Sequence, residues 1–313
     1  MIPFVRQDVG VAMKYFFIVN PAAGTRSAEE TLRGALIPYE GKIDYRVYVS
    51  AGPEDTERYL KGLREKEQGT LRLIACGGDG TLNMVVNAAR GMKDVQVGCY
   101  ACGSGNDYVK YYGKVENFLD LEKLFSARVE EVDLMSVGSR IAINMVHFGF
   151  DTNVVRRMQR LRRLPLIGGT RAYFSGVLCA LLSPMFTACE LTAEGERLCE
   201  GKMLLCTLGC GQFVGGGYRS SPRSSNTDGQ MEICLVKPLP RLKLLRLMSL
   251  YKKGLHLEEP SLKNLITYRR AQHARIRFPR ETGILLDGEI IMVKETDVRI
   301  LPRALSFLVP LGL

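Results

Sequence analysis

The chain has 313 residues, a length typical of one large domain or of two domains of ordinary size. Its 46% hydrophobic and 24% charged residues are ordinary for a globular protein, and no apolar run reaches the roughly 18 residues that a membrane-spanning helix needs. The net charge of +10 predicts an anionic partner such as nucleic acid, anionic lipid or nucleotide. Nine scattered cysteines and the absence of a signal-like apolar start favour a cytoplasmic protein with reduced thiols.

The first 130 residues or so alternate between strand-like and helix-like patterns. Short apolar runs predict strands at 14–20, 45–50, 71–76 and 95–102. Helical patterns lie between them at 27–36, where a capping box starts the helix, at 53–67 and at 82–90. Several of the strands lack a polar face, so the alternation predicts a doubly wound, parallel α/β domain over residues 1–133.

After Asp133 the pattern changes, and strand-like runs follow each other directly. They lie at 140–150, 185–193, 201–210, 230–238, 265–271, 273–279 and 283–293, with helical patterns near 153–183 and 240–253. This order predicts a second, mainly antiparallel β domain over residues 134–300. The apolar tail, about 301–313, is expected to return to the first domain. A cleft between two such domains is the expected place for a site.

Glycine-rich turns follow three strands of the first domain. They read "NPAAGTR" at 20–26, "GGDGTLN" at 77–83 and "GSGND" at 103–107. The carboxyl ends of parallel strands meet at one edge of a sheet, so the three turns are expected to converge on one ligand. Backbone N–H groups and the helix N-terminus after Gly80 suit phosphates. Asp79 would repel a bare phosphate, but it is well placed for a metal ion or a magnesium-bound phosphate.

Several common sites are excluded by spacing. The chain has no G-x-x-x-x-G-K-[ST] loop and no G-x-G-x-x-G after the first strand. Its histidines, His147, His256 and His273, have no metal-ligand spacing and no G-x-S-x-G nearby, so a hydrolytic triad is unsupported. The C-x-x-C of Cys99 and Cys102 lies in an apolar run and is interpreted as buried structure. Nothing resembles a nucleic-acid-binding motif, so no nucleic-acid partner is expected.

Five motifs in order resemble the diacylglycerol kinase catalytic domain family, which includes bacterial lipid kinases and sphingosine kinases. They are "FIVNPAAG" at 17–24, "GGDGTLN", "GSGND", the glycine-rich run with an Asp-Gly at 215–233, and "LLDGEII" at 285–291. The resemblance covers nearly the whole chain. It implies an N-terminal α/β nucleotide-binding domain, a C-terminal β-sandwich with a lipid pocket, and phosphoryl transfer from ATP with Mg²⁺ to a hydroxyl of a diacylglycerol-like lipid.

The resemblance also implies roles for individual residues. ATP contacts would come from Asn20, Pro21, Ala22, Ala23, Gly24, Gly77, Gly78, Asp79, Gly80, Thr81, Leu82, Asn83, Ser104 and Asn106. A structural magnesium would be held by Ser225, Asp228 and Gln230, with Asp133 nearby. Two departures from the family pattern stand out: Ala23 replaces a usual serine, and Met84 replaces a frequent glutamate.

Glu289 is the implied base that takes the lipid hydroxyl proton, and Asp79 and Asp287 complete the candidate catalytic set. Two residues apart at a strand start, Asp287 and Glu289 are expected on one face, where each would influence the pKa of the other. A hairpin turn with exposed acids is the alternative for "LLDGEII", and a turn aspartate is the alternative for Asp228.

Basic residues cluster at 156–165 and at 237–253, the second with interleaved leucines. They fit either an amphipathic helix packed on its own domain or a peripheral contact with an anionic membrane at the cytoplasmic face. A helix with its leucines facing inward and its basic residues facing outward would satisfy both interpretations.

The oligomeric state stays open, a homodimer included. Two rival functions also remain: an NAD kinase-like small-molecule kinase, and a weakly active lipid- or nucleotide-binding regulator.

Overall fold

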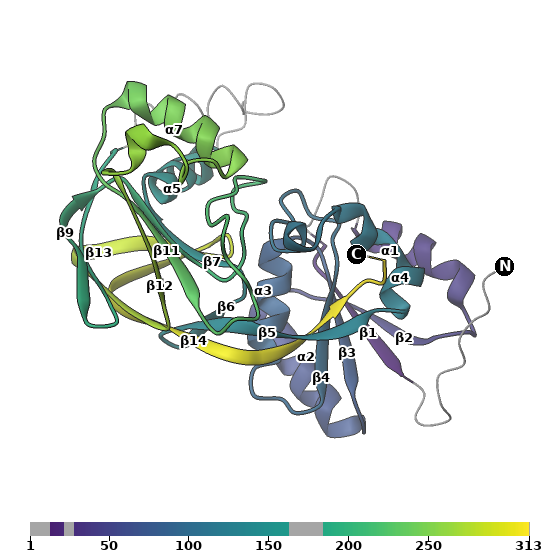
Figure 1. Cartoon of the computed structure of the whole chain (residues 1–313). Coiled ribbons are helices and arrows are strands. Elements are labelled where there is room, and N and C mark those ends of the chain that lie inside the picture. The colour runs from purple at the N-terminus through teal and green to yellow at the C-terminus, as the bar shows by residue number, and fades with distance from the viewer. Residues whose placement is uncertain (1–12, 22–27, 163–183, 313) are drawn as a thin grey trace.

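The computed structural model describes residues 13–21, 28–162 and 184–312. Its strands form one hydrogen-bonded sheet that passes through two halves of different architecture (Figure 1). Along the main path the strand order is β12-β11-β10-β7-β13-β14-β4-β3-β1-β2. The predicted fold class, an α/β half followed by a β-rich half, is therefore confirmed.

The N-terminal half is a parallel sheet covered on both faces. Its strands are β1 (Lys14–Val19), β2 (Asp44–Val49), β3 (Leu71–Cys76) and β4 (Val95–Tyr100). Its helices are α1 (Ala28–Leu36), α2 (Pro53–Lys66), α3 (Asp79–Ala88) and α4 (Leu121–Phe125), with short 3₁₀ turns at Ile37–Tyr39, Val109–Tyr112 and Val115–Leu119. Helices α2 and α3 pack on one face of the sheet, and α1 and α4 pack on the other.

The C-terminal half is mainly antiparallel. Its strands are β5 (Arg128–Val137), β6 (Arg140–Ala142), β7 (Met145–Gly149), β8 (Thr187–Ala193), β9 (Glu196–Met203), β10 (Leu205–Gly209), β11 (Met231–Val236), β12 (Ile266–Ala271), β13 (His273–Leu286) and β14 (Glu289–Val309). Helices α5 (Phe150–Arg162) and α7 (Arg241–Lys253) accompany them, with a 3₁₀ turn at Pro260–Leu262. The strands enclose one apolar cluster, and α7 covers a second. No helix in the described part of the chain is long and apolar enough to cross a membrane.

Two long strands join the halves. Strand β14 pairs with β13 along its first part, and its Ser306 and Phe307 pair with β4 of the parallel sheet. Strand β5 runs beside β14 through this junction, so residue 133 lies inside a strand. Figure 1 shows β5 and β14 extending from the β-rich half into the α/β half. The last strand of the chain therefore ends beside the parallel sheet of the first half.

The "LLDGEII" segment differs from the expected strand start. Asp287 and Gly288 form a two-residue hairpin turn between β13 and β14, with φ values of +47° and +93°. Positive φ at both positions is the signature of a turn whose twist matches the flanking strands. The expected single strand over 140–150 is also divided, because the backbone N–H groups of Ile143, Asn144 and Met145 turn toward the Asp287 carboxylate.

Candidate active site

Two of the glycine turns touch each other at the carboxyl edge of the parallel sheet. The N–H of Gly103 donates to the carbonyl of Gly77 at 3.1 Å. A Cβ atom on Gly103 would lie 2.3 Å from the Cα of Gly78, and a Cβ on Gly77 would lie 2.2 Å from Oγ1 of Thr81. Gly103 is therefore required because the backbone of Gly78 lies against it, and Gly77 because the Thr81 side chain fills the space that a Cβ would take.

Helix α3 begins directly after the first of these turns. Gly78 is its N-cap, and Asp79 to Thr81 form its first turn. The Asn20 side chain, from the end of β1, donates to Thr81 Oγ1 at 3.2 Å and so ties a third strand end to this helix. Free N–H groups and the helix dipole make such an N-terminus suitable for the anionic oxygens of a phosphate.

Asp79 lies in the first turn of α3, among these backbone N–H groups. Its Oδ1 accepts from the N–H of Tyr108 at 2.9 Å, and Gly105 leaves room for its Oδ2, which a Cβ there would approach to 2.9 Å. Burial raises the pKa of Asp79, and the nearby Asp107 raises it further. Asp107 itself is held by Lys110 Nζ at 2.7 Å and by the N–H of Gly216 at 2.8 Å.

Asp287 is a buried carboxylate that accepts four hydrogen bonds. Its partners are Asn83 Nδ2 at 2.7 Å and the backbone N–H groups of Ile143 at 2.7 Å, Asn144 at 3.1 Å and Met145 at 2.7 Å. Burial raises the pKa of Asp287 to about 6, although the four donors favour its ionised form. Since Asn83 belongs to α3 and the other donors follow β6, this carboxylate connects the two halves.

A cavity of about 440 Å³ lies between the glycine turns and the C-terminal half. Its lining residues are Asn20, Gly78, Asp79, Gly80, Thr81, Gly103, Ser104, Gly105, Asp107, Asn144, Met145, His147, Val155, Val214, Gly215, Gly216, Leu285, Asp287 and Gly288. The N-terminal half supplies polar groups and glycines. The C-terminal half supplies most of the apolar side chains, including Met145, Val155 and Leu285.

The structure brings together many of the residues predicted to contact a nucleotide. Those that line the cavity are Asn20, Gly78, Asp79, Gly80, Thr81 and Ser104. Gly77, Leu82, Asn83 and Asn106 support the turns from behind: Leu82 is in the core, and Asn106 donates to the carbonyls of Ala101 and Gly103. Pro21 does not line the cavity, and Ala22, Ala23 and Gly24 lie outside the described residues.

Glu289 is placed differently from Asp287. Its side chain is 49% exposed, forms an ion pair with Arg140 at 2.6 Å and does not line the cavity. The expectation that the two acids share a strand face is wrong, because Asp287 occupies the turn and Glu289 is the first residue of β14. Met84, where a glutamate is frequent in the family, packs against the core of the N-terminal half.

Of the four residues predicted for the magnesium site, Asp228 and Gln230 contact each other directly. Asp228 forms an ion pair with Arg270, and its Oδ1 accepts a hydrogen bond from the backbone N–H of Gln230. Asp133 accepts from the N–H groups of Gly229 at 2.6 Å and Arg303 at 2.8 Å. No cluster of three His, Cys, Asp or Glu suited to a metal occurs among the residues that the structure describes. The printed contacts of Asp133 and Asp228 are with other protein groups, and the role of the four residues in holding a metal stays a prediction.

Three polar residues of the cavity were not predicted: His147, Asn144 and Asp107. Asp107 is part of the "GSGND" turn, so its position after a strand was a usable signal. Asn144 and His147 lie in or beside β7, where the sequence shows only an apolar run. Their arrival at the cavity depends on strand pairing between distant segments, which local patterns do not reveal.

Comparison with known proteins agrees with this architecture. Residues 14–137 match the diacylglycerol kinase catalytic domain, and residues 144–309 match the YegS C-terminal NAD kinase beta sandwich-like domain. The chain therefore belongs to the diacylglycerol kinase-like family of lipid kinases. A diacylglycerol kinase of Staphylococcus haemolyticus is 26% identical, over 87% of this chain and 81% of that protein. A diacylglycerol kinase of Mycobacterium tuberculosis is 24% identical, over 97% of both chains.

Solved structures show the same fold. The crystal structure of a diacylglycerol kinase from Bacillus anthracis superposes with a TM-score of 0.70 at 17% identity, over 97% of this chain and 99% of that one. Yeast NADH kinase superposes with a TM-score of 0.50 at 12% identity, over 95% of this chain and 83% of that one. At these identities the likeness concerns the fold alone.

The contact between the two glycine turns can be tested by adding one methyl group. Gly103→Ala forces a Cβ toward Gly78, so we expect the free energy of unfolding to fall by about 1–3 kcal/mol. Gly62→Ala is the matched control, because Gly62 lies in α2 with nothing within 4 Å of its added Cβ. That control should raise the stability by roughly 0.5–1 kcal/mol. Urea unfolding measures both changes, and a Gly103→Ala protein as stable as wild type would contradict the packing described here.

Proposed function

We propose that the protein is an ATP- and magnesium-dependent lipid kinase that phosphorylates a hydroxyl of a diacylglycerol-like lipid. The observation that carries this proposal is the cavity lined by both the N-terminal and the C-terminal half. On one side are glycine turns, a helix N-terminus and the half-buried carboxylate of Asp79. On the other side apolar side chains lie among polar residues and glycines; the apolar ones are Met145, Val155, Val214 and Leu285. Membership of the diacylglycerol kinase-like family supports the same assignment.

The proposed roles follow from position. The N–H groups at the start of α3 and the adjoining turns hold the phosphates of ATP. Asp79 is the carboxylate that fits a magnesium ion accompanying those phosphates, because Asp107 is already held by Lys110 and Gly216. When bound, the ion would neutralise charge on the transferred phosphoryl group. The lipid hydroxyl would enter from the side of Met145, Val155 and Leu285.

Asp287 acts in this scheme as a positioning residue. A carboxylate has about four acceptor sites, and the four hydrogen bonds to Asp287 occupy them. It therefore fixes the C-terminal wall relative to α3. The hypothesis that Glu289 is the base finds no support in the geometry, since Glu289 is solvent-facing and paired with Arg140.

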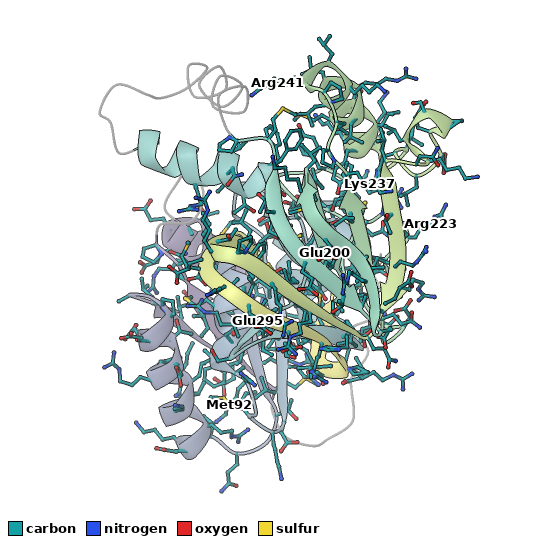
Figure 2. The ribbon with its side chains drawn as sticks, turned by 90° about the vertical axis from the view of Figure 1, so that its left-hand side faces the viewer. Met92, Glu200, Arg223, Lys237, Arg241 and Glu295 are labelled. Atoms are coloured by element: carbon teal, nitrogen blue, oxygen red, sulfur yellow. The ribbon has the colours of Figure 1, made fainter. Side chains whose placement is uncertain are left out.

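Helix α7 is the proposed membrane contact. Leu244, Leu247 and Tyr251 are buried, as expected, but Leu242 is 83% exposed and Leu245 59% exposed. The leucines of α7 therefore lie on both its packed face and its exposed face. Basic side chains of the same helix, Arg241, Lys243, Arg246, Lys252 and Lys253, accompany these two leucines. Arg241 lies at the opposite end of the molecule from Met92 of the α/β half (Figure 2). We propose that this end docks on the cytoplasmic face of an anionic membrane.

The chemical assignment is tested with Asp79→Asn, assayed with labelled ATP and dioleoylglycerol in mixed micelles. Loss of the carboxylate should lower kcat by at least about 10³, because charge stabilisation at the phosphoryl group is the main catalytic task. Thermal stability should change little, since the new amide still has an oxygen that can accept from Tyr108. Asp44→Asn removes an exposed acid of β2 and serves as the matched control.

A wild-type protein that labels no lipid in a broad panel would contradict the proposed function. Full turnover by Asp79→Asn would contradict the role of that residue. In the same assay Glu289→Gln should keep kcat within about threefold of wild type, because its side chain lies outside the cavity. A loss of about 10² or more, the minimum for removal of a general base, would restore Glu289 as the proton acceptor.

Membrane docking is tested by sedimentation with vesicles. Wild type should bind vesicles rich in phosphatidylglycerol more strongly than phosphatidylcholine vesicles, and the binding should weaken as salt shortens the Debye length. The double variant Leu242→Gln and Leu245→Gln should bind severalfold less, whereas Ile37→Gln, an exposed apolar residue of the other half, should bind as wild type does. Equal binding by all three proteins would contradict docking through α7.

A further inference from the structure

We propose that Cys189 and Cys199 form a redox-sensitive dithiol, a site of reversible oxidation in the C-terminal half. In this pair, Cys199 is the thiol that a hydroperoxide attacks, and Cys189 then closes a disulfide with it. Cys189 is on β8 and Cys199 is on β9. Neither residue lines the cavity of the candidate active site, so the inference is independent of the proposed function.

The two cysteines are neighbours on one face of an antiparallel pair of strands. Cys189 lies opposite Gly201, and Cys199 lies opposite Leu191. Opposite residues share a face, and so do residues two apart on one strand, so the two thiols are diagonal neighbours on the same face. Both pack on the apolar cluster that the C-terminal strands enclose. The thiol of Cys189 donates a hydrogen bond to the sulfur of Cys199.

Cys199 is the more reactive of the two thiols. It is partly exposed, whereas Cys189 is 3% exposed. The hydrogen bond from Cys189 lowers the pKa of Cys199 to about 7, and the Lys237 ammonium acts in the same direction, against the effect of burial. Cys206 on β10 is close to both thiols, and burial keeps it neutral by raising its pKa well above the usual value. The thiolate is the nucleophilic form of cysteine, so about half of Cys199 is reactive at pH 7.

The other cysteines of the described segments have different surroundings. Five are buried, and burial raises the pKa of each: Cys76, Cys99, Cys206, Cys210 and Cys234. Cys102 is partly exposed, but burial raises its pKa as well. Solvent access, a lowered pKa and an adjacent second thiol therefore coincide at Cys199 among these residues. This combination is typical of cysteines that oxidants modify reversibly.

The strand that carries Cys199 has freedom to adjust to the new bond. Strand β9 pairs with β8 alone among the described strands, and it lies at the outer edge of the C-terminal half (Figure 1). Diagonal neighbours start farther apart than the roughly 5.5–6 Å between Cα atoms that a disulfide favours. Gly201 has a φ of +117° and open space where a Cβ would lie, and the strand pairing is irregular beyond Leu191. A glycine inside an edge strand weakens it locally, so β9 can close this gap.

The oxidation takes place in two steps. The Cys199 thiolate attacks one oxygen of the hydroperoxide, the O–O bond breaks, and the sulfur becomes a sulfenic acid while the other oxygen leaves as an alcohol or water. The sulfur of Cys189 then attacks the sulfur of Cys199. The S–O bond breaks, the S–S bond forms, and the hydroxide takes the Cys189 proton and leaves as water. The two thiols lose two electrons, which reduce the hydroperoxide, and a dithiol reductant reverses the change.

The disulfide would reinforce strands that lead to the candidate active site. Strand β8 pairs with β13 through residues 274–277, and β13 continues to the turn that holds Asp287. The bond closes a short loop between β8 and β9, which restricts the unfolded chain. Oxidation should therefore stabilise the C-terminal half while the residues that line the cavity keep their places.

The inference is tested on the full, reduced chain treated with hydrogen peroxide at pH 7, with free thiols then blocked and the peptides mapped by mass spectrometry. Wild type should yield peptides joined through Cys189 and Cys199, and dithiothreitol should separate them. Cys189→Ala should stop at the Cys199 sulfenic acid, which dimedone traps. Cys102→Ser removes the other partly exposed cysteine and is the matched control, so it should form the bond as wild type does.

Two further readouts use the same protein. Iodoacetamide at pH 7 should alkylate Cys199 at least about fivefold faster than Cys102, because a lower pKa raises the thiolate fraction more than it lowers the nucleophilicity. The oxidised protein should unfold at a higher urea concentration than the reduced protein, and dithiothreitol should restore the original midpoint.

A wild-type chain that forms no bond between these two cysteines would overturn the inference. Equal alkylation rates for Cys199 and Cys102 would also overturn it, because the reactive thiol would then have no special character. None of these measurements needs kinase activity, so a failure of the proposed function and a failure of this inference are separate results.

Discussion

The architecture of the candidate active site depends on one buried carboxylate, that of Asp287. Asp287 lies in a two-residue turn and accepts hydrogen bonds from α3 of the N-terminal half and from the β6–β7 connection of the C-terminal half. Asn83 strengthens the same junction, because its amide also donates to the carbonyl of Ile141 at 2.8 Å. The N-terminus of α3 and the apolar wall are thus held at a fixed separation across the cavity, the preorganisation that in-line phosphoryl transfer requires.

This arrangement has an energetic cost that the fold must offset. An isolated carboxylate in the interior would take up a proton or destabilise the protein. The four donors compensate in part, and the remaining cost appears as the raised pKa of Asp287. The positive φ of Asp287 and Gly288 adds a backbone constraint, which glycine relieves at the second position. The junction is therefore specific and polar, whereas each half has its own apolar core.

Periodicity was sufficient to predict the parallel strands β1 to β4, and the rule that ligands bind at their carboxyl ends predicted that the glycine turns would meet. These features are local, or they follow from the topology of α/β sheets. The environment of Asp287 could not be predicted in the same way, because all four of its donors lie more than 140 residues away along the chain. The same reason explains why His147 was overlooked. The outward direction of Leu242 depends on which face of α7 packs on the strands, and a helix with leucines on several sides leaves that face undefined.

The buried junction is tested most directly by the pH dependence of stability in wild type and Asp287→Asn. With a pKa near 6 in the folded protein and near 3.9 when unfolded, Asp287 contributes stability below about pH 4 that is lost as the pH rises through 6. Urea unfolding should therefore show the stability of wild type relative to Asp287→Asn falling by about 2 kcal/mol between pH 4 and pH 7. A difference that stays constant over this range would mean that Asp287 is not buried in the folded protein, and would contradict the junction on which the site depends.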